Sequence, residues 1–202
     1  MKIALFGANG RVGKAVEKLA IERNHQVFAI DKHNCTTFDT PCDVAIDFSV
    51  AEATINVVDY CKRHLVPLVV GTTGHNSQQQ CLIDELSKVV CVVQKANFSR
   101  GIDVLTQLCK LVTSLCDWDC AIVETHRKHK LDAPSGTAKE LAKATGCNDI
   151  SSLRIGNQFG THSVVFAGID ETIEITHRAT SVDVFALGAI EIAEKIAKCN
   201  KN

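Results

Sequence analysis

Aromatic residues are scarce in this chain of 202 residues: they make up 5% of it, with one tryptophan and one tyrosine. Valine, isoleucine, leucine and alanine must therefore fill the core, as they do in parallel α/β proteins. A formal net charge of −1 argues against a nucleic-acid-binding protein, which needs a basic face. No apolar run has the length of a membrane span, and the start, MKIALFGANG, indicates a strand and a turn, not a signal peptide. We therefore expect neither nucleic acid nor membrane as a partner.

The ten cysteines lack the spacing of a metal site or a disulfide framework. There is no Cys-x-x-Cys, and the closest pair is Cys116 with Cys120. His126 and His129 lie three positions apart, but no third ligand is evident nearby. We expect reduced cysteines that pack as small hydrophobic residues in a cytoplasmic protein, and no metal site.

The first half of the chain alternates strands with helices. KIALFG is a buried strand, RVGKAVEKLAIERN has helical periodicity, and HQVFAID is a second strand. The turn GANGRVG follows the first strand and holds glycines at positions 7, 10 and 13. In a strand–turn–helix–strand unit, such glycines allow a tight turn and let backbone amides approach a pyrophosphate. The predicted cofactor contacts here are Gly7, Ala8, Asn9, Gly10, Arg11 and Val12.

Asp31 ends the second strand, eighteen positions after Gly13. An acidic residue near this point accepts the ribose hydroxyls in NAD-binding folds. Lys32 follows directly and could instead pair with the 2′-phosphate of NADP. The alternative interpretation is two solvated residues at a strand end. We expect NADH and NADPH both to be used, with a modest preference for NADH.

Three further strands follow: DVAIDFS (43–49), PLVVGTTG and VCVVQKANFS. A helix over 51–63 and a polar helix, QQQCLIDELSKV, connect them. Ligands bind at the carboxyl ends of strands in open parallel sheets. This rule adds a second group of predicted cofactor contacts: Gly71, Thr72, Thr73, Ala96, Asn97, Phe98 and Ser99.

From Gly101 the pattern changes. A helix, GIDVLTQLCKLVTSL, leads into the strand DCAIVETH, and a second helix starts where Thr137 and Glu140 match a capping box. THSVVFAG and ETIEITHRA alternate as antiparallel strands, and the amphipathic helix FALGAIEIAEKIAKCN closes the chain. We predict an α/β fold: a Rossmann parallel sheet over residues 1–97 and 183–202, and an α+β domain over 98–182 with an open, largely antiparallel sheet.

Residues 124–138, ETHRKHKLDAPSGTA, carry the strongest functional signal. His126, Arg127, Lys128, His129 and Lys130 directly precede the turn that starts a helix. Cations beside a helix N-terminus can hold carboxylates or phosphates. The alternative is a solvated basic loop before an ordinary cap, but the proline and glycine of the turn tighten it around the charges, which favours a site.

This segment resembles the signature of the 4-hydroxy-tetrahydrodipicolinate (dihydrodipicolinate) reductase family of lysine and diaminopimelate biosynthesis, roughly E-x-H-H-x-x-K-x-D-A-P-S-G-T-A. Arg127 stands where the family has its second histidine. The GTTG, ANFS and EITHRA segments also resemble the family, in the same order along the chain. The loop between Asp31 and Asp43 is short, so the chain is similar to a compact family member.

The resemblance implies reduction of 4-hydroxy-tetrahydrodipicolinate, by way of dihydrodipicolinate, to tetrahydrodipicolinate, with NADH or NADPH as cofactor and a homotetramer as the assembly. We predict His126 as general acid, since a histidine pKa lies near working pH. Lys130 would hold a ring carboxylate and stabilise developing negative charge. Arg127 and the amides of Gly136 and Thr137 would bind this small dicarboxylate. The alternatives are an NAD(P)-sensing Rossmann protein without catalysis and another small NAD(P)-dependent dehydrogenase, such as an amino-acid or semialdehyde dehydrogenase.

Overall fold

The computed structural model of the chain describes residues 1–34 and 36–199. It divides into two compact units. The N-terminal unit consists of Met1–Phe98 and of the chain from Asp183 onward, and the C-terminal unit is Ser99–Val182. Each unit has its own sheet and its own hydrophobic core.

A five-stranded parallel sheet of order β2-β1-β3-β4-β5 forms the centre of the N-terminal unit. Its strands are β1 (Lys2–Phe6), β2 (Gln26–Ile30), β3 (Val44–Asp47), β4 (Leu68–Val70) and β5 (Val92–Gln94). The central strands β3 and β4 are buried along their whole length, because helices cover both faces of the sheet. The predicted Rossmann sheet is confirmed.

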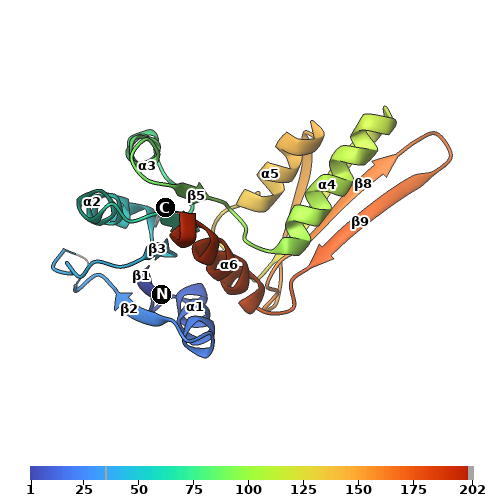
Figure 1. Cartoon of the computed structure of the whole chain (residues 1–202). Coiled ribbons are helices and arrows are strands. Elements are labelled where there is room, and N and C mark those ends of the chain that lie inside the picture. Colours follow the sequence, from blue (N-terminus) through green and yellow to red (C-terminus); the bar gives the residue numbers. More distant parts are fainter. Residues whose placement is uncertain (35, 200–202) are drawn as a thin grey trace. The chain divides into compact units, whose positions relative to one another are not determined.

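Helices α1 (Arg11–Glu22) and α6 (Asp183–Cys199) lie on one face of this sheet. Helices α2 (Thr54–His64) and α3 (Ser77–Ser87) lie on the other (Figure 1). The predicted helix over 51–63 begins instead with a separate 3-10 turn, η1 (Ala51–Ala53). The last helix packs very closely: a Cβ at Gly188 would lie 1.8 Å from the carbonyl oxygen of Phe98.

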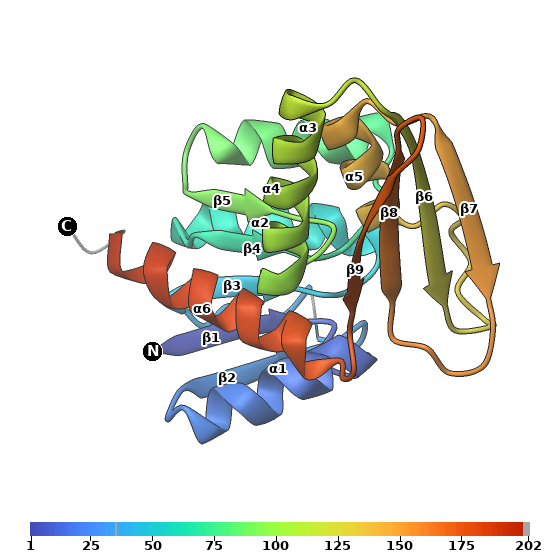
Figure 2. The same ribbon diagram turned by 90° about the vertical axis from the view of Figure 1, so that its right-hand side faces the viewer.

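The C-terminal unit is built on a four-stranded sheet of order β7-β6-β8-β9. The strands are β6 (Asp119–His126), β7 (Asp149–Arg154), β8 (Thr161–Ala167) and β9 (Thr172–Arg178). Two of the three pairings are antiparallel, so the predicted largely antiparallel sheet is confirmed, while β7 runs parallel to β6. Helices α4 (Arg100–Leu115) and α5 (Gly136–Thr145) cover one face (Figure 2).

Strand β7 was not among the predicted elements. Its sequence, DISSLR, is short and has only two apolar residues, so periodicity alone did not distinguish it from a loop. It pairs with β6 after the chain has crossed the sheet through α5, and that pairing is a tertiary feature.

Alternation along β6 places polar and apolar side chains on the same helix-covered face. Ile122, Glu124 and His126 are all buried, since residues two apart on a strand point the same way. Ile122 joins the core under the helices. Glu124 and His126 occupy the end of the same row, so a buried polar site adjoins that core.

Among residues 1–34 and 36–199, no helix combines the length and apolar character that a membrane crossing requires. Nine cysteines in the same residues are free thiols. That part of the chain also holds no group of three or more His, Cys, Asp or Glu side chains arranged to bind a metal ion.

Candidate active site

In the N-terminal unit, residues at the carboxyl ends of β1, β2 and β3 line a cavity of about 540 Å³. The order β2-β1-β3 means that the chain leaves β1 in one direction and later returns on its other side. Open α/β sheets bind ligands at such a switch point. The lining includes five predicted cofactor contacts: Gly7, Asn9, Gly10, Asp31 and Lys32.

The glycine turn beside this cavity has no room for larger residues. Gly7 has φ +79°, and a Cβ there would lie 2.4 Å from the carbonyl oxygen of Phe48. A Cβ at Gly13 would lie 2.1 Å from the carbonyl oxygen of Gly7. Gly10 is the N-cap of α1 and has no side chain to occupy the helix N-terminus. The turn therefore fits a phosphate held by backbone amides.

Asp31 is held in place at the rim of the cavity. Its carboxylate accepts hydrogen bonds from Asn9 Nδ2 at 2.9 Å and from the His33 amide at 2.8 Å. The His33 amide is the main cause of a lowered pKa of Asp31, so the group is anionic at neutral pH. Asn9, from the glycine turn, thus orients the carboxylate predicted to contact the ribose.

A second cavity, of about 460 Å³, is lined by residues that follow β3 and β4 and by the start of α1. Its lining includes the predicted contacts Arg11, Val12, Gly71, Thr72 and Thr73. Phe48 and Ser49 line both cavities, although they were not predicted. The rule for carboxyl ends of strands would have found them, since they directly follow β3. Phe48 also explains Gly71, where a Cβ would lie 2.1 Å from its ring.

The remaining predicted cofactor contacts lie as follows. Ala8 is buried in the glycine turn, and Ala96 is half-buried after β5. Asn97 is buried, and the ring of Phe98 packs edge-on against Phe48 with centroids 5.6 Å apart. Ser99 begins the C-terminal unit, where it caps α4 and contacts His177 Nε2 through its hydroxyl at 3.1 Å.

A row of polar side chains crosses the sheet of the C-terminal unit. Glu124 of β6 is paired with Ser152 of β7 and with His162 of β8, and His162 is paired in turn with His177 of β9. Cross-strand partners stand on the same face of a sheet. Two residues further along β6 and β7, His126 and Arg154 form the next pair on this face. Pairing thereby brings together residues from four strands.

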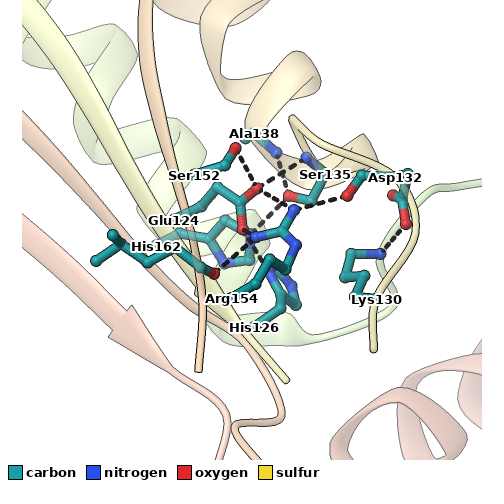
Figure 3. A network of polar contacts seen from close by, with 10 residues as sticks. Glu124, His126, Lys130, Asp132, Ser135, Ala138, Ser152, Arg154 and His162 are labelled. Atoms are coloured by element: carbon teal, nitrogen blue, oxygen red, sulfur yellow. Dashed lines mark hydrogen bonds and ion pairs between the residues drawn. The ribbon is translucent and has the colours of Figure 1, made fainter. Parts of the chain in front are cut away.

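Glu124 is the centre of this group (Figure 3). Its fully buried carboxylate accepts five hydrogen bonds. The guanidinium of Arg154 donates two of them, at 2.7 and 2.9 Å. The Ser152 hydroxyl donates at 2.7 Å, the Ser135 amide at 3.1 Å, and His126 through Nδ1. Burial alone would raise the pKa of Glu124, but these donors outweigh it and lower the pKa to about 2.

Two histidines stand beside this carboxylate. The rings of His126 and His162 meet edge-on with centroids 5.1 Å apart. Burial lowers the pKa of His126 and acts against Glu124, which raises it. Burial also lowers the pKa of His162 to about 3, so this histidine is neutral at physiological pH. His162 Nε2 lies 3.2 Å from the hydroxyl of Ser135.

Ser135, and not the predicted Thr137, caps α5. Its hydroxyl accepts a hydrogen bond from the Ala138 amide at 3.2 Å, and the helix begins at Gly136. The capping-box prediction was wrong: Ser135, two residues before Thr137, has the extended backbone of an N-cap, and serine suits that position as well as threonine does. Gly136 and Thr137 are therefore the first two helical residues, where amides have no acceptor within the helix.

The loop between β6 and α5 carries the other predicted residues. Lys130 Nζ pairs with Asp132 Oδ1 at 2.7 Å, and Arg154 donates to the carbonyl oxygen of Asp132 at 2.6 Å. The Arg127 amide donates to the carbonyl oxygen of Gln158 at 3.0 Å. The structure thus groups His126 and Lys130 with the start of α5. Ser152, Arg154 and His162 were not predicted, since only strand pairing brings them to Glu124.

The N-terminal unit has a switch-point cavity beside a glycine turn, and the C-terminal unit has a cluster of histidine, carboxylate and guanidinium groups at a helix N-terminus. These features are those of a Rossmann-type oxidoreductase with a separate α+β unit. Family models for dihydrodipicolinate reductase match the whole fold: the N-terminus over residues 1–98 and the C-terminus over residues 101–202. The chain therefore belongs to the dihydrodipicolinate reductase family, which confirms the resemblance.

Individual relatives agree. The chain is 40% identical to the 4-hydroxy-tetrahydrodipicolinate reductase of Thermosipho africanus (strain TCF52B), over 97% of the chain and 91% of the relative. It is 38% identical to that of Xylella fastidiosa (strain 9a5c), over 97% and 92%. Its fold matches the dipicolinate-bound dihydrodipicolinate reductase from Paenisporosarcina sp. TG-14 with a TM-score of 0.75 at 19% identity, over 98% and 95% of the two chains.

We predict that acid destabilises the C-terminal unit through His162 and Glu124. Both have folded-state pKa values, about 3 and about 2, below their ordinary values of 6.5 and 4.5. The unfolded chain therefore binds more protons than the folded protein as pH falls through this window, and stability is lost. The titration of His162 alone should lower the free energy of unfolding by up to about 3 kcal/mol as the pH falls from 7 to 4.

Urea unfolding followed by the fluorescence of Trp118, the only tryptophan, reports on this unit. His162→Gln should flatten the dependence of unfolding free energy on pH. His33→Gln, at an exposed histidine of the other unit, is the control and should leave it unchanged. A His162→Gln variant with the parent's pH dependence would contradict the prediction.

Proposed function

We propose that this protein is a 4-hydroxy-tetrahydrodipicolinate reductase that uses NADH or NADPH. The observation that supports this most strongly is the cluster of His126, Lys130 and the start of α5. Relatives with that name match the chain over nearly their full length. Residues 1–97 and 183–202 would bind the dinucleotide. Residues 98–182 would bind the substrate and mediate self-association.

The substrate is a ring that carries two carboxylates. The amides of Gly136 and Thr137, at the positive end of α5, suit one carboxylate. Arg127 would add a bidentate contact to the same carboxylate. Lys130 suits the other. The relative from Paenisporosarcina is described as bound to dipicolinate, itself a ring dicarboxylate, which supports this choice of ligand.

The chain's own residues would manage proton and charge, while the bound nicotinamide supplies a hydride. Hydride addition leaves an enamine-like anion that must gain a proton. His126 would donate it, because it is a histidine beside the dicarboxylate site with one ring nitrogen engaged by Glu124. Lys130 would stabilise the developing negative charge.

The cluster also weighs against the alternatives. A non-catalytic NAD(P) sensor has no use for a histidine supported by a buried carboxylate beside a helix N-terminus. A semialdehyde dehydrogenase would need a nucleophilic cysteine, and residues 124–138 contain none.

His126→Ala and Lys130→Ala should each lower kcat by roughly 10²-fold or more, the scale of general acid–base catalysis. Affinity for NADH should be preserved, since neither residue belongs to the N-terminal unit. Arg127→His, which restores the family's residue, should be milder and change mainly KM. NADH oxidation is the assay, with dihydrodipicolinate synthase generating the substrate in situ. Near-parental turnover in both alanine variants would mean that the cluster is only a binding surface.

Asp31→Ala should lower the ratio of activity with NADH to activity with NADPH. The carboxylate would accept ribose hydroxyls in NADH but repel a 2′-phosphate, and Asn9 already orients it. The kcat/KM values for both cofactors measure the ratio. Asp59→Ala, an exposed carboxylate on α2, serves as the charge-matched control. An unchanged ratio in Asp31→Ala would show that another residue discriminates.

The protein should form a homotetramer through the C-terminal unit. Helices α4 and α5 cover one face of its sheet, and no element of that unit covers the other. An open face and edge need cover, which copies of the chain would supply. Sedimentation velocity at micromolar concentration should show the tetramer. A monomer under those conditions would contradict the proposal.

A further inference from the structure

The hydrogen bonds around Glu124 decide which nitrogen of His126 can exchange a proton. An ionised carboxylate can only accept hydrogen bonds. Glu124 stays ionised, because four donors besides His126 hold it. The contact between Glu124 and His126 Nδ1 therefore requires a proton on Nδ1. Nε2 is left as the nitrogen that gains or loses a proton.

The backbone keeps space beside that second nitrogen. Gly160, with φ +145°, lies across from the ring, and a Cβ there would lie 3.0 Å from His126 Nε2. His126 is buried, with 9% of its surface exposed. A ring turned the other way would no longer place Nδ1 against Glu124, and the carboxylate would lose one donor.

A lone carboxylate beside a histidine would hold the proton too firmly, since an opposite charge favours the charged form. Arg154 prevents this. Its guanidinium covers both oxygens of Glu124, so the carboxylate orients His126 while its charge is offset. The other charged or titratable groups that face His126 are Lys130 from the following loop, with its partner Asp132, and the neutral His162 from β8.

We propose that Glu124 and Arg154 are a positioning pair for His126: Glu124 keeps a proton on Nδ1, and Arg154 offsets the carboxylate charge so that Nε2 can release its proton. The pair deepens the proposed function, because it rests on His126 as the proton donor. Arginine is required at this place, since its planar fork matches a carboxylate with two parallel bonds and lysine cannot do so.

The first test needs no substrate. In protein with ¹⁵N-labelled histidine, the ring nitrogens of His126 are followed between pH 5 and pH 9 and assigned by their loss in His126→Ala. Nδ1 should remain protonated throughout, and Nε2 should titrate. A neutral form with its proton on Nε2 would overturn the role of Glu124.

Variants then test Arg154. Arg154→Gln should raise the pKa of His126 by about 1 unit, because Glu124 is no longer offset. Arg154→Lys keeps the charge without the fork, and should raise it by less. Arg23→Gln is the matched control: Arg23 makes a two-bonded pair with Glu194, which also contacts His25, but in the other unit. It should leave His126 unchanged.

A folded Arg154→Gln variant with the parent's His126 titration would overturn the proposal. If that variant does not fold, Arg154→Lys decides, and an unchanged or lowered pKa of His126 would count against the pair. Circular dichroism reports folding in each case.

Activity separates this inference from the proposed function. The basic limb of kcat/KM against pH, where a general acid loses its proton, should move upward in Arg154→Gln by the shift seen for His126. A purely structural pair would lower activity without moving the limb. If His126 shifts and the limb does not, the positioning pair stands and His126 is not the general acid. If His126→Ala abolishes turnover while the titration of His126 is unchanged in Arg154→Gln, then His126 is the general acid and the positioning pair is wrong.

Discussion

A carboxylate with no access to water governs the architecture of the C-terminal unit. Taking the charge of Glu124 out of solvent costs several kcal/mol unless protein groups replace the lost water. Donors from β6, from β7 and from the residue before α5 do so together. Losing one partner of such a buried pair typically costs about 3–5 kcal/mol. The two strands and the helix start are therefore held in one arrangement.

The same arrangement presents the chemistry. The Ser135 amide donates to Glu124, and α5 begins at the next residue. The N-terminus of the helix therefore lies beside the site. The hydroxyl of Ser135 caps the helix and also contacts His162. Polar groups that satisfy the buried charge thus also orient His126 and the helix amides. Stability and proposed function rest on shared hydrogen bonds in this unit.

The N-terminal unit depends on close packing at glycines, whereas the C-terminal unit depends on a buried charge. Gly7, Gly13 and Gly71 each stand where a Cβ would overlap a neighbouring backbone or ring. Without side chains at these positions, the strand ends, the first helix and Phe48 approach one another around two adjoining cavities. Fixing the rim in this way brings Asn9 within hydrogen-bonding distance of Asp31, at 2.9 Å.

Local sequence determined the order of the elements, the parallel first sheet and the family. Periodicity, glycine turns and the run from Glu124 to Ala138 are encoded by residues close together in the chain, and most strands and helices lie where they were predicted. The cap of α5 was misplaced by two residues, because Ser135 and Thr137 both suit the position and only the path of the preceding turn selects one.

Only the tertiary structure decided how the polar residues meet. Arg154 lies thirty positions from Glu124, on a strand with too few apolar residues to be predicted alone. Parallel pairing of β7 with β6, after the crossing through α5, brings the two together. His162 arrives by antiparallel pairing from the other side. Strand order and register depend on contacts between distant segments, and no local pattern in the sequence specifies them.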